Sequence, residues 1–257
     1  MSRNLLSRSL EPLVAILWGL FIASSVWLAV VWLTPLNSST LGFAMEEGAP
    51  LPPNAAFRAA VLLLAQNADL IWFALAVVSL HLVITASNGL AAARAWLAFT
   101  AGSALLLGWL NVTTRIPFGA MAFGDGLGGK LFGVPIGWPL LWAALVIAAR
   151  EAVLWAKPRL SHASVSLVSA LVVLATIANV EPTVRHSRGW WDWFLDTPRN
   201  PSGVHVWAWV AWFIWPWLVV FSMREKDVVA GVAPRTVRPM IILAVLNVVA
   251  LLARFRS

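Results

Sequence analysis

Four acidic residues stand out because they lie among tryptophans, phenylalanines and prolines, in two segments between long apolar runs. They are Asp125, Glu181, Asp192 and Asp196. A carboxyl group in apolar surroundings can keep its proton at neutral pH and donate it to a reacting atom. These residues therefore predict acid catalysis. Ion pairs with the arginines of the same segments explain each acid equally well.

Four histidines add a second kind of candidate. No two of them have the close helical spacing of a zinc site, and the chain has no cysteine, so no metal and no metal-based cofactor is expected. His186 and His205 flank one segment and could meet there. His81 lies within an apolar run, where an ionisable side chain is either a functional group or a hydrogen-bonded interior residue.

Tryptophan is concentrated in the stretch "GWWDWFLDTPRNPSGVHVWAWVAWFIWPW". Trp190, Trp191 and Trp193 precede an apolar run, and Trp209 and Trp212 continue deep into it. Indole faces stabilise a cation where water is excluded, and they can also line a slot for a long polyene. Both uses suit an apolar substrate, whereas ordinary helix packing explains the same residues about as well.

The stretch "AFGDGLGGKLFGVP" imitates a nucleotide-phosphate loop. Gly124 is followed by four residues and then by Gly129-Lys130, but Leu131 stands where such a loop needs Ser or Thr. The flanking segments are apolar runs and not the strand and helix that the motif requires. We therefore expect no nucleotide site, and the glycines predict a backbone that packs closely where side chains would obstruct.

The composition of the chain indicates which class of protein carries these residues. Of 257 residues 60% are hydrophobic and only 11% are charged, whereas a soluble domain is about a quarter charged. The chain is therefore predicted to be an integral membrane protein. Its net charge of +7 is scattered between apolar runs, which favours loops facing anionic lipid and argues against nucleic-acid binding.

Apolar runs near 20 residues predict membrane-spanning helices. We predict an all-α, polytopic bundle of about seven such helices, with interfacial or re-entrant loops, in a single domain over residues 1–257. A further helix over Asn54–Leu70 is too short to span and is expected to lie at the interface. The predicted spans are Leu13–Leu33, Leu70–Leu90, Ala92–Val112, Gly133–Ala156, Leu160–Val180, Val204–Met223 and Met240–Ala253.

The order of the spans constrains the loops. The loops at 34–69, 113–132 and 181–203 are odd-numbered, so they lie on one side of the membrane and bring the candidate acids and tryptophans together. Placing the N-terminus in the cytoplasm puts ten basic residues inside against eight outside, which favours that orientation. The expected location is a bacterial-type cytoplasmic membrane.

Two sequence blocks resemble one family, the membrane-bound carotenoid biosynthesis proteins related to bisanhydrobacterioruberin hydratase. "TTRIPFGAMAFGDGLGGKLFGVPIGWPLLW" is similar to the family's central signature, with Pro117-Phe118-Gly119 and Gly133-Val134-Pro135 in register. Glu181-Pro182 and Gly189 to Trp193 are similar to a second block. Family members usually carry Glu where this chain has Gly108 and Asn where it has Ala208.

The resemblance implies addition of water across the terminal double bond of an acyclic carotenoid, a lyase-class reaction that needs no cofactor. It implies Glu181 or Asp125 as the acid and Asp192 or His205 as the group that orients water. The substrate would be bound by aromatic and loop residues of the two blocks. These are Phe118, Gly119, Trp138, Trp190, Trp191, Trp193, Trp209 and Trp212.

Two other functions compete with the hydratase. A non-catalytic carotenoid-binding or pigment-assembly subunit of the same fold is favoured by Gly108 and Ala208. A small-solute transporter would need internal repeats and polar or broken helices. No repeat is evident, and His81 is the one ionisable residue in the middle of an apolar run. The expected partners are a lycopene-like acyclic carotenoid or other polyene lipid, membrane lipid, and other carotenoid enzymes or pigment proteins.

Overall fold

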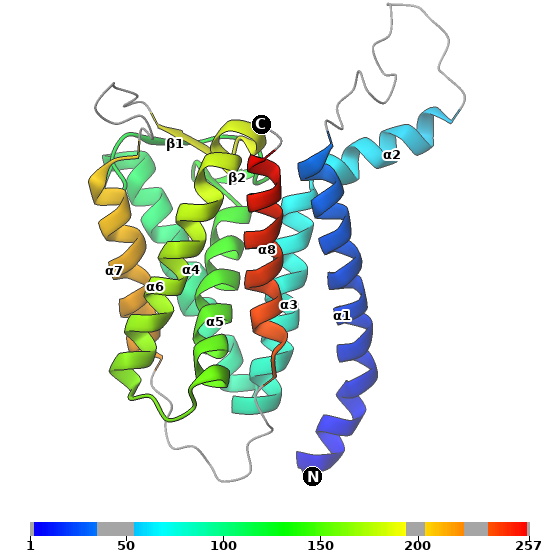
Figure 1. The fold of residues 1–257 in the computed structure, drawn as a ribbon, viewed down its shortest axis with the longest axis vertical. Helices are drawn as coiled ribbons and strands as arrows, with labels where there is room; N and C mark the ends of the chain where they lie inside the picture. Colours follow the sequence, from blue (N-terminus) through cyan, green and yellow to red (C-terminus); the bar gives the residue numbers. More distant parts are fainter. Residues whose placement is uncertain (1–2, 35–53, 194–203, 224–235, 256–257) are drawn as a thin grey trace, which may run out of the picture.

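The computed structural model describes residues 3–34, 54–193, 204–223 and 236–255. Within these ranges eight α-helices form a bundle that carries short strands at one end (Figure 1). The helices are α1 (Arg3–Leu33), α2 (Ala55–Gln66), α3 (Ala68–Asn88), α4 (Leu90–Thr114), α5 (Gly137–Ala156), α6 (His162–Thr183), α7 (Val206–Ser222) and α8 (Arg238–Arg254). A π-helical turn, η1 (Val184–Arg188), extends α6.

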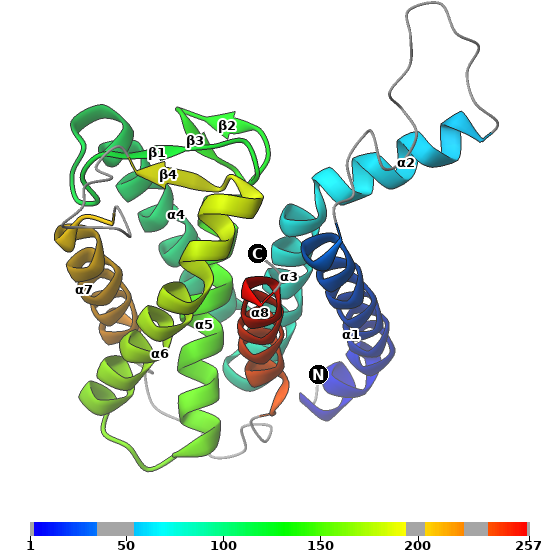
Figure 2. The ribbon, with the colours of Figure 1, turned by 45° about the horizontal axis from the view of Figure 1, so that its top comes forward.

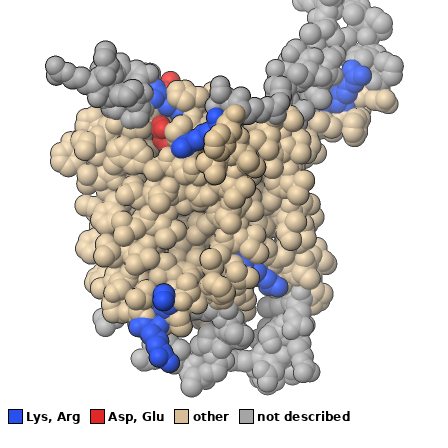
Figure 3. All heavy atoms as spheres, in the orientation of Figure 1, with Lys and Arg blue, Asp and Glu red and all other residues tan. Residues whose placement is uncertain are grey.

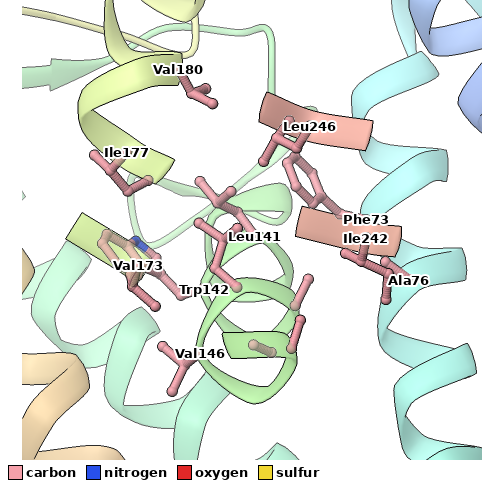
Figure 4. Packing of buried hydrophobic residues seen from close by; sticks show 14 of the residues in the cluster. Phe73, Ala76, Leu141, Trp142, Val146, Val173, Ile177, Val180, Ile242 and Leu246 are labelled. Carbon is pink, nitrogen blue, oxygen red and sulfur yellow. The ribbon is translucent and has the colours of Figure 1, made fainter. Parts of the chain in front are cut away.

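Helix α5 lies at the centre of the bundle. It contacts α3, α4, α6, α7 and α8, and nearly all of its residues from Leu141 to Leu154 are buried. Figure 4 shows Leu141 and Val146 of α5 between Val173 of α6 and Ile242 of α8. Helix α5 therefore forms the core against which these helices pack.

The outer helices expose apolar side chains instead of charges. Five helical segments are long and apolar enough to cross a membrane, and α7 is a shorter apolar helix. On the face drawn in Figure 3, charged residues gather toward the two ends of the bundle and leave an uncharged band between them. This pattern is that of a membrane protein. The five segments are Pro12–Leu33, Ala68–Asn88, Leu90–Thr114, Gly137–Ala156 and His162–Arg188.

The seven predicted spans all correspond to helices, although the number of membrane crossings stays a prediction. Helices α7 and α8 run alongside the others (Figure 1) but have 17 residues each. At 1.5 Å per residue each is about 26 Å long, slightly short of a hydrocarbon core of about 30 Å.

Two predicted boundaries were wrong in a way that matters for the site. The span predicted from Gly133 begins at Gly137, because Val134–Pro135 forms a strand before it. The interfacial helix predicted over Asn54–Leu70 ends at Gln66, and α3 starts at Ala68. Asp69 therefore lies in the first turn of a membrane helix. Figure 2 shows α2 extending away from the bundle, as an interfacial helix does.

In the described part of the chain, four short strands cover the end of the bundle, a feature that the all-α prediction did not include. β1 (Met121–Phe123) pairs antiparallel with β4 (Trp191–Trp193), and β2 (Lys130–Leu131) pairs with β3 (Val134–Pro135). Figure 2 shows β1 and β4 side by side above α4 and α6. The β1–β4 pair confirms that the loops at 113–132 and 181–203 lie on the same side.

Candidate functional site

The glycine-rich loop packs against the backbone of the second loop. The amides of Gly124 and Gly126 donate to the carbonyls of Trp190 and Gly189, each over 3.1 Å. A Cβ atom at Gly124 would lie 2.0 Å from the Gly189 oxygen, and one at Gly126 would lie 2.0 Å from the Arg188 oxygen. Only glycine permits this approach, so the structure confirms the packing that the sequence predicted for these residues.

Strand β4 directs its tryptophans into the protein. Side chains alternate across a strand, and here Trp191 and Trp193 are buried while Asp192 between them is exposed. Pairing with β1 fixes this register, with Asp192 opposite Ala122. The strand thus separates the residues of "WDW" into an aromatic inner face and an acidic outer face.

The tryptophans of the second loop meet those of α5 and α7. Trp212 is the centre of this group: its ring lies 5.7 Å from that of Trp193, 6.1 Å from that of Trp191 and 5.1 Å from that of Trp209. Trp191 also contacts Trp138 and Trp190. We refer to seven aromatic residues of this group together as the aromatic cluster. They are Phe118, Trp138, Trp190, Trp191, Trp193, Trp209 and Trp212.

Phe118 and Gly119 reach the cluster because Asn111 of α4 holds their loop. The Asn111 side chain accepts a bond from the Phe118 amide over 3.0 Å and donates to the Met121 carbonyl over 3.2 Å. The Phe118 ring then packs on Trp138 and Trp212. The structure therefore brings together all eight residues predicted to bind substrate, since Gly119 lies against His205 at the edge of the same loop.

Glu181 is the predicted acid that the structure places at the cluster. It lies near the end of α6, is 4% exposed, and accepts a hydrogen bond from the Trp193 indole over 3.0 Å. Arg185, His186 and Arg254 lie within electrostatic range of its carboxyl group. Glu181 is thus a buried carboxyl group that accepts a hydrogen bond from a neutral indole of the aromatic cluster.

The apolar surroundings expected for Asp125 are not found. Its side chain is 96% exposed and pairs with the Lys130 ammonium over 2.9 Å. Asp192 also faces outward, 68% exposed, and pairs with Arg185. Hydrogen bonds from the Trp193 amide and from Arg185 lower the pKa of Asp192. Asp196 lies outside the described residues.

His205 begins α7 and caps it. Its Nδ1 accepts a hydrogen bond from the Trp207 amide over 3.3 Å. A Cβ atom at Gly119 would stand 3.2 Å from the His205 ring, so the ring and the Phe118–Gly119 turn touch. His205 therefore lies at the outer edge of the aromatic cluster, and its other ring nitrogen has no hydrogen-bond partner within the part of the chain that the structure describes.

Asp69 is a central residue that the sequence reasoning missed. It is fully buried, and its carboxylate accepts bonds from the Trp32 indole over 2.7 Å, the Trp190 indole over 2.9 Å and the Arg188 guanidinium over 2.8 Å. These donors come from α1, η1 and the loop before β4. An acid directly before an apolar run was the available signal, but the predicted helix boundary hid it.

A second buried pair of charges lies inside the bundle. Arg150 and Glu151 are both 2% exposed and form an ion pair. The Arg150 guanidinium also lies 4.2 Å from the centre of the Trp96 ring. The pair lies on α5, away from the strands that carry the aromatic cluster.

Comparison with known proteins decides the family. A family model described as carotenoid biosynthesis protein matches residues 67–254, most of the chain. The chain belongs to the carotenoid biosynthesis protein family. The match begins just before Asp69 and includes every residue of the aromatic cluster, while α1 and α2 precede it. Neither the curated proteins nor the solved structures gave a match.

The two positions at which this family member departs from the expected pattern both lie close to the cluster. A Cβ atom at Gly108 would lie 2.9 Å from a Val134 methyl group and 3.1 Å from the Trp138 indole nitrogen. Ala208 is fully buried one helical turn before Trp212. The specific relation to bisanhydrobacterioruberin hydratase stays a prediction.

Proposed function

We propose that this carotenoid biosynthesis protein is a membrane hydratase that adds water to the terminal double bond of an acyclic, lycopene-like carotenoid. The observation that carries the proposal is the contact between Glu181 and the aromatic cluster through Trp193. Hydration of a trisubstituted alkene needs an acid, a shielded place for a tertiary cation and a water molecule. The arrangement supplies a candidate for each.

Glu181 is the acid in this proposal. Asp69 is also buried, but its carboxyl oxygens are already engaged by the Arg188 guanidinium and by the Trp32 and Trp190 indoles, so its role here is structural. The Glu181 carboxyl proton is transferred to the terminal alkene carbon, and the positive charge develops on the neighbouring tertiary carbon. Arg185, His186 and Arg254 then stabilise the Glu181 carboxylate that remains.

The indole rings stabilise the cation. Trp193, Trp212 and Trp191 are buried, with Trp212 packed edge to face on Trp193 and tilted against Trp191, and Trp193 contacts Glu181 directly. An aromatic face attracts a cation most strongly where water is excluded. The same rings offer no nucleophile or basic nitrogen that would trap the cation.

Water completes the reaction by adding to the tertiary carbon. In this proposal His205 orients that water, because its Nδ1 is occupied by the Trp207 amide and its Nε2–H is left to donate to a water oxygen. The Glu181 carboxylate takes a proton from the adding water, which yields the tertiary alcohol and restores the acid. Asp192, exposed and paired with Arg185, is better placed to hold β4 than to orient water.

A non-catalytic carotenoid-binding subunit is the second candidate. The observation that favours it is the pair of departures at Gly108 and Ala208, both close to the aromatic cluster. In that case the cluster would hold a polyene, and Glu181 would serve only to hold Trp193. Association with other carotenoid enzymes or pigment proteins fits either candidate.

One experiment separates the two candidates. The full chain is expressed in a bacterium that makes lycopene, and the pigments are extracted and weighed by mass spectrometry. The hydratase yields a carotenoid heavier by one water, whereas unchanged lycopene that co-purifies with the protein supports the binding subunit and contradicts the hydratase. We also propose a bacterial cytoplasmic membrane with the N-terminus inside, which reporter fusions to the two ends of the chain test.

A further inference from the structure

Two indole groups in the aromatic cluster have polar atoms that the fold does not use. The Nε1 atoms of Trp191 and Trp212 are buried and have no hydrogen-bond partner among the described residues. Both side chains are almost completely buried, and their rings contact each other with centroids 6.1 Å apart. Two neighbouring rings of the same apolar cluster thus each carry an unused donor.

Neighbouring tryptophans show that the fold ordinarily satisfies such donors. Trp32 and Trp190 donate to Asp69, and Trp193 donates to Glu181. Trp138 and Trp72 donate to the Ala104 carbonyl and the Ser25 hydroxyl. Buried polar groups nearly always have a partner, and an exception calls for an explanation. Trp191 and Trp212 are exceptions inside the candidate site.

The chemistry of indole restricts what can bind there. The Nε1–H group is a donor and never an acceptor, so its partner must carry a lone pair. Trp212 also contacts Trp193, whose own N–H group holds Glu181. The Trp212 ring, which carries one of the unused donors, is therefore one ring away from the buried carboxyl group, and the Trp191 ring packs on Trp212.

We propose that Trp191 and Trp212 form a binding site for an acceptor oxygen, through which the protein distinguishes an oxygenated polyene end group from a hydrocarbon one. This inference rests on the proposed function and deepens it, because the oxygen is either the tertiary hydroxyl of the end group or the water that becomes it. The hydrocarbon end of lycopene has no lone pair and gains nothing from these donors.

The test is a binding measurement on the purified full chain in lipid nanodiscs. Lycopene and an acyclic carotenoid with a tertiary hydroxyl on its end group are titrated by absorbance against wild type, Trp191→Phe and Trp212→Phe. Phenylalanine keeps an aromatic ring and removes the N–H group. If the hydroxyl is the ligand, each variant binds the hydroxylated carotenoid about 5- to 10-fold more weakly, as expected for one lost hydrogen bond. Its affinity for lycopene stays within about twofold of wild type.

A second measurement tests whether the bound oxygen is that of water. If the donors hold the water, both affinities stay unchanged, and the hydration of lycopene shows a lower kcat at an unchanged KM in the two variants. Trp18→Phe is the matched control, because the buried Trp18 Nε1 atom also has no hydrogen-bond partner among the described residues but lies on α1, outside the cluster. It should change neither affinity nor turnover.

Four results would overturn the inference. One is an equal loss of affinity for both carotenoids, which means that the rings matter and the N–H groups do not. Another is the same loss in Trp18→Phe. The third is that both variants bind the two carotenoids with wild-type affinity and also hydrate lycopene at the wild-type rate. Unchanged affinities together with no hydration by any of the proteins, wild type included, would overturn it as well. A wild-type chain that binds the hydroxylated carotenoid selectively but hydrates nothing would contradict the proposed function and leave the oxygen site standing.

Discussion

The Trp193 indole donates to the Glu181 carboxyl group over 3.0 Å, and so joins the short strand β4 to the end of helix α6. The contact links a residue that was expected to be an acid with one that was expected to form an aromatic wall. Because Trp193 also packs on Trp212, a proton on Glu181 is one ring away from the centre of the aromatic cluster.

Glu181→Gln is expected to abolish hydration and to leave the fold intact. The amide oxygen of glutamine still accepts the Trp193 bond, but the amide has no acidic proton to give. The loss should be at least about 100-fold, the usual contribution of a general acid, measured as hydrated carotenoid formed in lycopene-producing cells. Asp125→Asn tests the competing assignment, and normal hydration by Glu181→Gln together with loss in Asp125→Asn would refute ours.

Asp69→Asn is expected to destabilise the protein. The substitution leaves the Arg188 guanidinium beside a neutral amide and weakens the bonds from Trp32 and Trp190. Breaking a buried ion pair costs about 3–5 kcal/mol, seen as a lower unfolding temperature in detergent. Asp125→Asn removes an exposed pair, worth about 0–1 kcal/mol, and is the matched control. Equal unfolding temperatures for the two variants would contradict a structural role for Asp69.

The sequence predicted most of the helices because long apolar runs have few other structures open to them in a membrane. It also predicted that Phe118, Trp138 and Trp212 belong to one site. It did not predict the β1–β4 pair, because strands of three residues such as Trp191–Trp193 carry no periodic signal.

The sequence could not predict which of the acidic side chains are buried. Asp125 and Glu181 were both expected in apolar surroundings, yet the Asp125 side chain is 96% exposed and Glu181 is 4% exposed. The difference arises because Glu181 lies on α6, where Trp193 of β4 contacts it. Asp125 lies between Gly124 and Gly126, whose backbone packs against the second loop and leaves the Asp125 side chain on the outside. Asp69 and Arg188 meet across a separation of 119 residues, which no local pattern reveals.

Gly126→Ala is expected to separate the two loops that form the site. The new methyl group would meet the Arg188 carbonyl at 2.0 Å, and backbone must move to relieve that overlap. Overpacking of this kind costs about 1–3 kcal/mol or more, and hydration should fall with the unfolding temperature. Gly129→Ala is the matched control in the same loop, because its nearest neighbour would be 4.0 Å away. A Gly126→Ala protein as stable as Gly129→Ala would show that the loops are not held this closely.

Asp192 predicts a dependence of stability on pH. Its folded pKa is lowered by the Trp193 amide and by Arg185, so its contribution is fully present above the ordinary aspartate pKa and is lost as pH falls through the lowered value. Wild type should therefore lose more stability than Asp192→Asn on acidification below about pH 4. The measurement is the unfolding temperature of both proteins in the same detergent across that range, and parallel curves would refute the prediction.

Arg150 and Glu151 predict that one substitution harms the protein more than two. Glu151→Gln leaves the Arg150 charge buried in the bundle with the Trp96 ring as a remaining partner, and we expect a loss of about 3–5 kcal/mol. The double variant Arg150→Met, Glu151→Leu removes both charges and fills the space with apolar atoms, so its stability should exceed that of Glu151→Gln. Thermal unfolding of both variants and wild type in one detergent checks the order. A double variant less stable than both Glu151→Gln and wild type would contradict the prediction, because the ion pair would then stabilise the bundle more than apolar side chains do.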